Sequence, residues 1–480
     1  MSMADFIGRQ GELKDLQTLL KKDGASLVVL RGRRRVGKSR LIEEFTFNLP
    51  TISFAGIPPT KNTTAQSQRE EFSRQMQYEL KIKKPQADDW GALFRELVDL
   101  NQERPIVVVL DEISWVGSKD PDFLGKLKLA WDRGFSKNKK LILILCGSVS
   151  SWIEENILSS TGFVGRITLS MHLKPLSLSN SCEFWASQGD RVSPYEIFKV
   201  LSVTGGVPRY LEEILPSETA EENIHRLCFK ESGLLFNEFD QIFNDLFSAR
   251  STVCKNILLH MSDRSLFLKD VYEALNVQPS GAYAEHVDDL VKAGFVSRDY
   301  TWDLKTGKES NLSRFRVSDN YIRFYLKAIL PNKKSILAGT YNASSIVHRE
   351  GWKSLLGLQF ETLVLNNVNE LYKHLNIPPG DVQRAGPFFQ RKSLKNRGCQ
   401  IDLLIQTYHR VLYLVEIKFS QNEITNDVKS EVQRKIDALS LPKGFSVKPV
   451  LIHVNGVCGS VYPDRFFAHI VDFSDLLKKG

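Results

Sequence analysis

One octapeptide near the start of the chain carries the residue types that hold a nucleoside triphosphate. Gly32-Arg33-Arg34-Arg35-Val36-Gly37-Lys38-Ser39 fits the pattern GxxxxGK[ST] and lies between the apolar run 26–31 and a helical pattern that starts at residue 38. Glycines let the backbone curl so that amide N–H groups face phosphate oxygens, and the N-terminus of the following helix adds partial positive charge. Lys38 is expected to reach the β- and γ-phosphates and Ser39 to ligate Mg²⁺, so the expected ligands are ATP and Mg²⁺.

A pair of carboxylates supplies the second part of this chemistry. The buried run 106–110 ends in Asp111 and Glu112, where Asp111 can hold the Mg²⁺ shell and Glu112 can polarise the attacking water. The next apolar run, 141–146, leads to Ser148, which either senses the γ-phosphate or caps the helix that follows. The predicted nucleotide-binding set is Gly32, Val36, Gly37, Lys38, Ser39, Arg40, Asp111 and Ser148.

A third cluster of chemical side chains lies near the C-terminus. Alternate residues of a strand share a face, so Glu416 and Lys418 point the same way out of an otherwise apolar run, and burying both costs several kcal/mol unless something pairs with them. Asp402 on a neighbouring strand and Glu361 in the helical pattern GLQFETLVLNNV can add carboxylates. This set suits Mg²⁺- or Mn²⁺-dependent phosphodiester hydrolysis, with Glu416 and Lys418 as catalytic residues and Glu361, Asp402 and Glu416 as metal ligands. A structural ion pair between Asp402 and Lys418 is the alternative.

The elements that must position these groups follow two α/β patterns with helices between them. Residues 26–172 alternate apolar runs with amphipathic stretches, which predicts βα units around a buried parallel sheet. Residues 178–248 are helical only, and three helical patterns followed by two β-like runs over 250–325 predict a winged helix. Alternation resumes in a helix at 352–373, strands at 399–407 and 411–419, a helix at 426–440 and a strand at 448–453. The predicted divisions are an ATPase core (1–175), a helical lid (176–248), a winged helix (249–330), a linker (331–345) and an α/β domain (346–480).

Charge along the second half indicates where nucleic acid can bind. The sequence RKSLKNR suits phosphate contacts through Arg391, Lys392, Lys395 and Arg397, although such a run is also typical of a solvated turn. The third helix of the winged-helix segment is acidic, which favours docking or gating over reading DNA because phosphates repel it. Its charges are Glu285, Asp288 and Asp289 against Lys292, whereas Arg298, Lys305 and Lys308 in the hairpin keep DNA contact open.

Composition excludes several protein classes. The chain has 480 residues, 42% hydrophobic and 25% charged, which indicates about three globular domains and excludes wholesale disorder. The 64 basic and 56 acidic residues give a net charge of +8, a mild excess that fits an anionic partner. Six scattered cysteines favour a reducing compartment over a disulfide framework or a zinc cluster. The N-terminus lacks the apolar core of a signal peptide and no apolar run can cross a bilayer, so we expect a cytoplasmic protein with no membrane partner.

The first half of the chain resembles the archaeal-type ATPase family of the AAA+/STAND branch of P-loop NTPases. The motifs that carry the resemblance are FIGRQGEL at 6–13, the P-loop, Gly165-Arg166 before a strand, and GGVPRYL at 205–211. It implies that the segment Phe6 to Arg9, with Gly8, and Pro208 flank the adenine. It also implies that Arg166 is an arginine finger or sensor, with a surface ion pair as the alternative; if Arg166 acts in trans, oligomers are required. Ser148 departs from the Asn or Thr common at that sensor, which leaves the rate of hydrolysis open.

Residues 350–475 resemble the PD-(D/E)xK restriction-endonuclease-like domain that is often fused behind such ATPases. Asp402 and Glu416-x-Lys418 match the signature, Ile401 replaces its proline, and Gln433 matches its accessory glutamine. The resemblance implies an α/β multidomain ATPase that controls a nuclease acting on nucleic acid, DNA in the first place, in defence against foreign DNA. The alternatives are a nucleotide-switched scaffold with a silent nuclease fold, whose winged helix docks a partner protein, and an ATP-driven DNA remodeller or chaperone.

Overall fold

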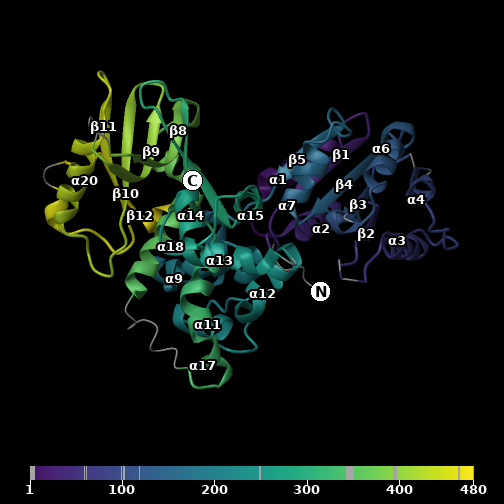
Figure 1. The fold of residues 1–480 in the computed structure, drawn as a ribbon, viewed down its shortest axis with the longest axis horizontal. Helices are drawn as coiled ribbons and strands as arrows, with labels where there is room; N and C mark the ends of the chain where they lie inside the picture. Colours follow the sequence, from purple (N-terminus) through teal and green to yellow (C-terminus); the bar gives the residue numbers. More distant parts are fainter. Residues whose placement is uncertain are drawn as a thin grey trace. The chain divides into compact units, whose positions relative to one another are not determined.

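The computed structural model describes residues 6–58, 60, 62–98, 100, 103–117, 119–247, 250–341, 351–392, 397–462 and 465–478. Two compact units divide the chain, Met1–Pro175 and Leu176–Gly480 (Figure 1). No helix among the described residues is long and apolar enough to span a membrane.

The first unit is built on a parallel sheet of five strands in the order β2-β3-β4-β1-β5 (Figure 1). The three inner strands are formed by continuous apolar runs because both of their faces are covered, whereas β2 at the edge alternates buried and exposed residues. The C-terminal ends of β1, β4 and β3 lie side by side, so the sheet brings together the three segments that the motifs predicted. The strands are β1 (Ser26–Arg31), β2 (Thr51–Ala55), β3 (Ile106–Asp111), β4 (Leu141–Gly147) and β5 (Ile167–His172).

Two cores stabilise this unit, one on each face of the sheet. Leu16, Leu41 and Phe45 pack from α1 (Gln10–Leu19) and α2 (Lys38–Thr46) on one face. On the other face the aromatic side chains of Phe72, Trp90, Phe94 and Phe123 contact one another. The remaining elements are α3 (Ala65–Leu80), α4 (Trp90–Val98), α5 (Ile113–Gly117), α6 (Phe123–Arg133), η1 (Phe135–Lys137), α7 (Ser150–Ile153) and the π-turn η2 (Glu154–Leu158).

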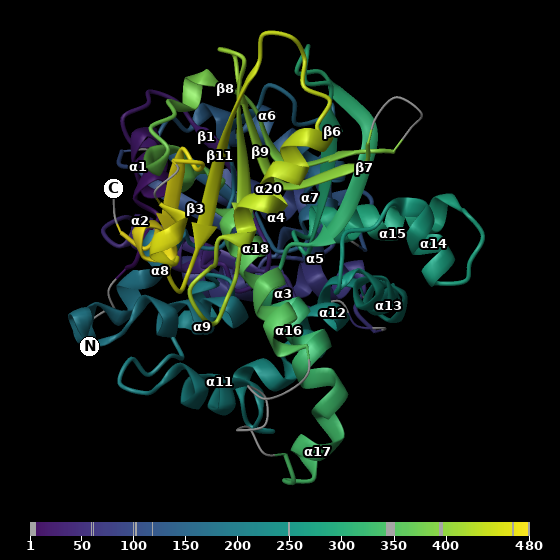
Figure 2. The same cartoon turned by 90° about the vertical axis from the view of Figure 1, so that its left-hand side faces the viewer.

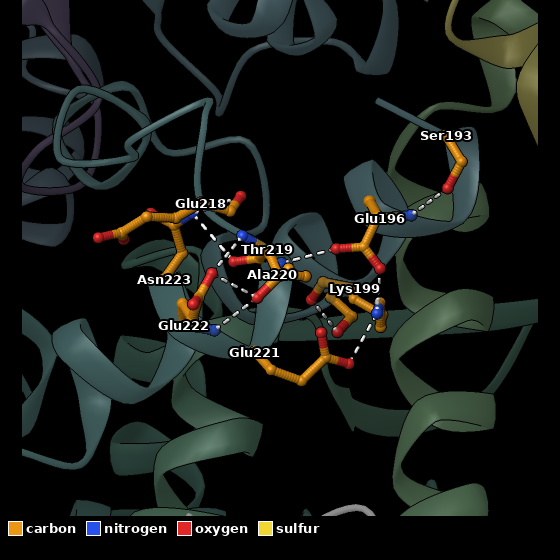
Figure 3. Close-up of polar contacts among 10 residues, drawn as sticks. Ser193, Glu196, Lys199, Glu218, Thr219, Ala220, Glu221, Glu222 and Asn223 are labelled. Atoms are coloured by element: carbon orange, nitrogen blue, oxygen red, sulfur yellow. Dashed lines mark hydrogen bonds and ion pairs between the residues drawn. The ribbon is translucent and has the colours of Figure 1, made fainter. Parts of the chain in front are cut away.

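The second unit begins with helices, which span the residues that we predicted as a lid. They are α8 (Leu178–Cys182), η3 (Glu183–Arg191), α9 (Pro194–Thr204), α10 (Pro208–Leu211), α11 (Ala220–Cys228) and α12 (Leu234–Phe247). Side chains fix where these helices begin (Figure 3): Ser193 caps α9, and Thr219 and Glu222 form a reciprocal capping box on α11. Lys199 on α9 pairs with Glu221 on α11 at 2.6 Å, which ties the two helices together.

Three helices and a hairpin follow, which is the order of elements from which the sequence patterns predicted a winged helix. They are α13 (Ser251–Met261), α14 (Leu268–Ala274), α15 (Gly281–Lys292) and an antiparallel hairpin of β6 (Val296–Trp302) and β7 (Glu309–Val317). Asp289 of the acidic helix α15 is buried and pairs with Arg250, so it does not add to the charge of the helix surface, contrary to our expectation. The structure continues in α16 (Asn320–Phe324), the π-turn η5 (Tyr325–Ile329), η6 (Leu330–Asn332) and α17 (Lys333–Leu337). The predicted linker at 331–345 is therefore helical up to Leu337, and residues 342–345 lie outside the described residues.

A second sheet completes the chain, and its strands β8, β9 and β11 are labelled in Figure 2. The strand order is β12-β11-β10-β9-β8. Strand β9 pairs antiparallel with β8 and β10, whereas β11 is parallel to β10 and β12. The elements are α18 (Trp352–Asn366), α19 (Val368–His374), η8 (Pro379–Asp381), β8 (Val382–Gln390), β9 (Cys399–Thr407), β10 (Val411–Ile417), α20 (Asp427–Ala438), β11 (Ser446–His453), η9 (Gly459–Val461), β12 (His469–Asp472) and α21 (Phe473–Leu476). The sequence patterns missed β8 and β12.

The winged-helix hairpin packs against this second sheet. Thr301 donates a hydrogen bond to the carbonyl of Phe389 on β8 at 2.8 Å, and the indole N–H of Trp302 donates to Gln406 on β9 at 2.7 Å. On the lid side, the ring of Phe198 in α9 lies 5.5 Å from Phe360 in α18. One hydrophobic core thus runs through the lid, the winged helix and the C-terminal α/β domain.

Candidate functional site

The P-loop follows β1 and leads into α2, the context that phosphate binding requires. Gly37 precedes α2 with φ of 89°, a left-handed conformation that favours glycine. Gly32 lies so close to the neighbouring chain that an added Cβ would meet the Leu173 carbonyl at 2.5 Å. Lys38 is buried, and its ammonium group donates to the carbonyls of Gly32 at 2.9 Å and Arg33 at 3.2 Å. The lysine that is expected to bind phosphate thus also contacts the backbone of the loop.

Arg9 fastens the segment before α1 to the P-loop. Its guanidinium donates to the carbonyls of Val36, at 3.1 Å, and of Lys174, and it pairs with Glu12 at 3.0 Å. Burial lowers the pKa of Arg9 although Glu12 opposes the shift. Nearby, the guanidinium carbon of Arg40 lies 5.8 Å from the centre of the Phe6 ring. The predicted adenine-side residues Phe6, Gly8 and Arg9 therefore belong to the same unit as the P-loop, whereas Pro208 is the first residue of α10 in the other unit.

The carboxylates after β3 face the end of β4. Ser148 is buried and donates to Glu112 through its backbone N–H at 3.1 Å and through its hydroxyl at 2.9 Å. Glu112 has φ of 46°, an uncommon conformation for a non-glycine residue. The structure thus joins Ser148 to the predicted general base.

The oxygen donors at this site fit Mg²⁺. The hydroxyl of Ser39, which is exposed, and the carboxylate of Asp111 are hard ligands, and Mg²⁺ keeps several of its waters, so one or two protein ligands suffice. Ser39 and Asp111 would hold the ion, as the motifs predicted.

Arg166 forms an ion pair within its own unit. Its Nε and a terminal nitrogen bond the two oxygens of Asp132 at 2.7 and 3.0 Å, and this contact lowers the pKa of Asp132 to about 2. This is the surface ion pair that was the alternative to an arginine finger.

The C-terminal carboxylates meet around a lysine that the sequence patterns missed. Lys435 on α20 places its ammonium nitrogen 2.5 Å from Glu416 and 3.3 Å from Asp402, and Asp402 also accepts the backbone N–H of Ile417 at 3.1 Å. Burial and the charge of Asp402 raise the pKa of Glu416, while Asp402 and Glu416 together outweigh the burial of Lys435 and raise its pKa. The sequence patterns did not predict Lys435, because a lysine on a helix is ordinarily a surface residue. Its part in the site follows only from the packing of α20 against the sheet.

The other predicted residues of this site are more dispersed. Lys418 pairs with Glu431 at 2.5 Å rather than with Asp402, so the alternative ion pair does not form. Gln433 does not reach the site, because it is exposed and bonds Asp437 on its own helix. Burial and Asp402 raise the pKa of Glu361 to about 7. Among the described residues, no three His, Cys, Asp or Glu side chains are grouped to hold a metal.

The basic loop lies between β8 and β9. Arg391 and Lys392 are exposed at its start and Arg397 at its end, whereas Lys395 falls outside the described residues. Arg391 lies over the ring of Phe267, 4.8 Å from its centre.

Comparisons with known proteins found one matching family and several similar chains. Residues 6–214 match a family described as an ATPase domain predominantly from Archaea. An uncharacterised protein of Methanocaldococcus jannaschii is 25% identical over 439 residues, which cover 90% of each chain. The Walker-type ATPase of Pyrococcus abyssi is 20% identical with a TM-score of 0.53, over 67% of this chain and 96% of that one, which is a likeness of fold. The ORC2 protein of Aeropyrum pernix is 15% identical with a TM-score of 0.40, over 70% of this chain and 95% of that one.

The family match and the fold of the Walker-type ATPase agree with the P-loop and the parallel sheet of the first unit, and they confirm the predicted P-loop α/β fold. Residues 6–214 of the chain are thus similar to an archaeal-type ATPase domain, and the first unit has the α/β fold of P-loop ATPases.

Proposed function

We propose that this ATPase controls a metal-dependent nuclease in the C-terminal α/β domain, which acts on nucleic acid. The observation that supports the nuclease is the meeting of Asp402 and Glu416 on the paired strands β9 and β10, both within 3.3 Å of one ammonium group. Acidic side chains are buried together at such cost chiefly where they bind a cation. The order of helix, three antiparallel strands, helix and parallel strand is consistent with the restriction-endonuclease-like fold that the motif resembles.

Each side chain has a role in this proposal. Asp402 and Glu416 would hold Mg²⁺ or Mn²⁺, which supplies Lewis-acid activation of a phosphodiester when bound. Lys418 would orient the attacking water after it leaves Glu431, and Glu361 would approach the site from α18. The ATPase unit would set access to this site through its nucleotide state, with Glu112 as the base for hydrolysis. The order of domains along the chain motivates this control.

A silent nuclease fold is the second candidate. Lys435 lies where a divalent cation would neutralise Asp402 and Glu416, and Lys418 is engaged by Glu431. A permanent ammonium group at that place would leave a nucleotide-switched scaffold that binds nucleic acid or a protein without cutting it. An ATP-driven remodeller would differ again, since DNA would stimulate its ATP hydrolysis without cleavage.

Cleavage assays separate these candidates. Supercoiled plasmid and single-stranded RNA are incubated with the full chain in Mg²⁺ or Mn²⁺, with ATP, with ADP and without nucleotide. We expect cutting that disappears in Glu416→Gln and Lys418→Ala but persists in Lys443→Ala, an exposed lysine in the loop after α20. Equal cutting by all four proteins would indicate a contaminant, and no cutting under any condition would favour the scaffold. Equal rates in the three nucleotide states would remove the control by ATP.

A further inference from the structure

The chain passes from the first unit to the second through residues 173–177, which have no regular secondary structure. The first unit holds the start of this segment. The backbone N–H of Leu173 donates to the carbonyl of Arg31 at 2.8 Å, and the guanidinium of Arg9 donates to the carbonyl of Lys174. The first unit therefore fixes the chain up to the carbonyl of Lys174.

The second unit fixes the chain from Leu176 onward. The backbone N–H of Leu176 donates to the carbonyl of Gly206 at 2.8 Å. Gly206 has φ of 74°, and a Cβ added there would meet the Leu176 carbonyl at 2.6 Å, so a larger residue would displace this segment. The preceding Gly205 lies against Asn320, where an added Cβ would be 3.2 Å from the Asn320 Cβ. The paired glycines of the motif at 205–211 thus hold the chain where it enters the second unit.

The two anchors are separated by the backbone torsions of Pro175. The peptide group before Pro175 carries the carbonyl that Arg9 binds, and the peptide group after it carries the N–H that Gly206 binds. The φ and ψ angles of Pro175 lie between these two groups, and the proline ring fixes φ at about −65°. Rotation about ψ of Pro175 can therefore turn one unit against the other without breaking either anchor.

Helices α8, α9 and α10 lie within the ATPase family match, which extends to residue 214, and they also lie in the second unit. Phe198 on α9 is fully buried. Its ring has three aromatic neighbours, at centroid distances of 5.5, 5.5 and 5.6 Å: Phe360 on α18, Phe419 after β10 and Phe473 on α21. The last helices of the ATPase family match are therefore packed into the core of the C-terminal α/β domain.

Buried amide groups join α9 to α18. The side chain of Gln359 on α18 donates to the carbonyl of Ser202 on α9 at 2.6 Å and to the carbonyl of Asn320 at 2.7 Å. The side chain of Asn320 donates in turn to the carbonyl of Gln359 at 3.0 Å. Gln359 is 0% exposed and Asn320 is 1% exposed. Pulling α9 away from α18 would leave these polar groups buried without partners, which is costly in free energy.

Helix α8 is joined in a similar way to α19. The backbone N–H of Leu178 at the start of α8 donates to the side-chain oxygen of Asn367 at 3.2 Å, and the hydroxyl of Ser179 donates to Glu370 at 2.7 Å. The lid is thus bonded to two helices of the C-terminal α/β domain, beginning two residues after the anchor at Leu176.

We propose that the lid and the C-terminal α/β domain turn as one body about Pro175 when ATP binds at the P-loop. The contacts of α8 and α9 with α18 and α19 all lie within this body, so the turn breaks none of them, whereas a lid that opened by itself would break them all. ATP would then change the orientation of the whole C-terminal α/β domain and leave its interior unchanged. The movement requires no cleavage, but its role in controlling access to Asp402 and Glu416 rests on the proposed function.

Distance measurements on the full chain test the proposal. Spin labels are attached through unnatural amino acids at exposed positions, so the native cysteines stay unchanged. The first pair of labels replaces Tyr78 on α3 and Tyr408 at the β9–β10 turn, one in each unit. The second pair replaces Leu215, in the loop after α10, and Tyr408, both in the second unit. Electron spin resonance then gives each distance without nucleotide, with ADP and with a non-hydrolysable ATP analogue.

We expect the ATP analogue to shift the distance of the first pair by several ångströms and to leave the distance of the second pair unchanged. In Lys38→Ala, which lacks the phosphate-binding ammonium group, the first pair should not respond. A nucleotide-dependent shift in the second pair would overturn the proposal, because the lid would then move against the C-terminal α/β domain. A first pair that ignores nucleotide, or that responds equally in Lys38→Ala, would overturn it too. Since no nucleic acid is present, the expected shifts in a protein that never cuts would keep the movement and remove the nuclease.

Discussion

Ser148 donates two hydrogen bonds to the carboxylate of Glu112, one from its backbone N–H at 3.1 Å and one from its hydroxyl at 2.9 Å. The two residues follow neighbouring parallel strands, β3 and β4, so the contact spans the edge of the sheet beside the P-loop. A carboxylate that accepts several hydrogen bonds is fixed in direction, which is a property that a general base requires.

Replacing Glu112 by glutamine should therefore stop turnover without stopping binding. Glutamine keeps the size and accepts the same hydrogen bonds, but it cannot take a proton from water. We expect the rate of ATP hydrolysis to fall by about 10² to 10⁴ while the affinity for ATP stays the same. The comparison is Glu43→Gln on the solvent side of α2, which should hydrolyse ATP at the normal rate. Retention of hydrolysis in Glu112→Gln would assign the base elsewhere.

Arg9 gives a prediction about the stability of the nucleotide site. Arg9→Gln removes donors from the carbonyls of Val36 and Lys174 in a buried place, which should cost roughly 1–3 kcal/mol in the free energy of unfolding of the first unit. Because Val36 belongs to the P-loop, ATP should also bind several times more weakly. Chemical denaturation and nucleotide titration measure the two effects, with the exposed Arg74→Gln as control. Weaker binding with unchanged stability would instead indicate a direct contact between Arg9 and ATP.

Some of the residues in these predictions could be predicted from the sequence, and others could not. The P-loop and Asp111-Glu112 were predictable because each motif is local and follows a continuous apolar run. Strands β8 and β12 were not predicted, because neither has a regular apolar pattern. Strand β8 lies between β9 on one side and the winged-helix hairpin on the other. Lys435 was missed for a different reason, because its contacts with Asp402 and Glu416 form only when α20 packs on the sheet.

Because of Glu361, the free energy of unfolding should fall as the pH rises. Its pKa is about 7 in the folded protein against an ordinary 4.5, so between these values the folded state holds more protons than the unfolded state and loses stability with increasing pH. The loss has an upper limit of roughly 3 kcal/mol. Glu361→Gln should remove this dependence between pH 5 and pH 8 in urea denaturation, whereas Glu285→Gln, on an exposed position of α15, should keep it. The same slope in both variants would contradict the assignment.

Replacing Lys435 can show whether Asp402 and Glu416 form a metal-cation site or only a structural ion pair with the lysine. Lys435→Met leaves Asp402 and Glu416 without their ammonium partner, which should cost about 3–5 kcal/mol in the absence of metal. If the carboxylates can hold a divalent cation, Mn²⁺ should then raise the melting temperature of the variant, since a ligand that binds only the folded state stabilises it. The double variant with Glu416→Gln should lose this response, and Lys443→Met should melt like the wild type. A destabilised Lys435→Met that Mn²⁺ does not rescue would mean that the lysine is the permanent cation of this domain, and the silent scaffold would then be the better description.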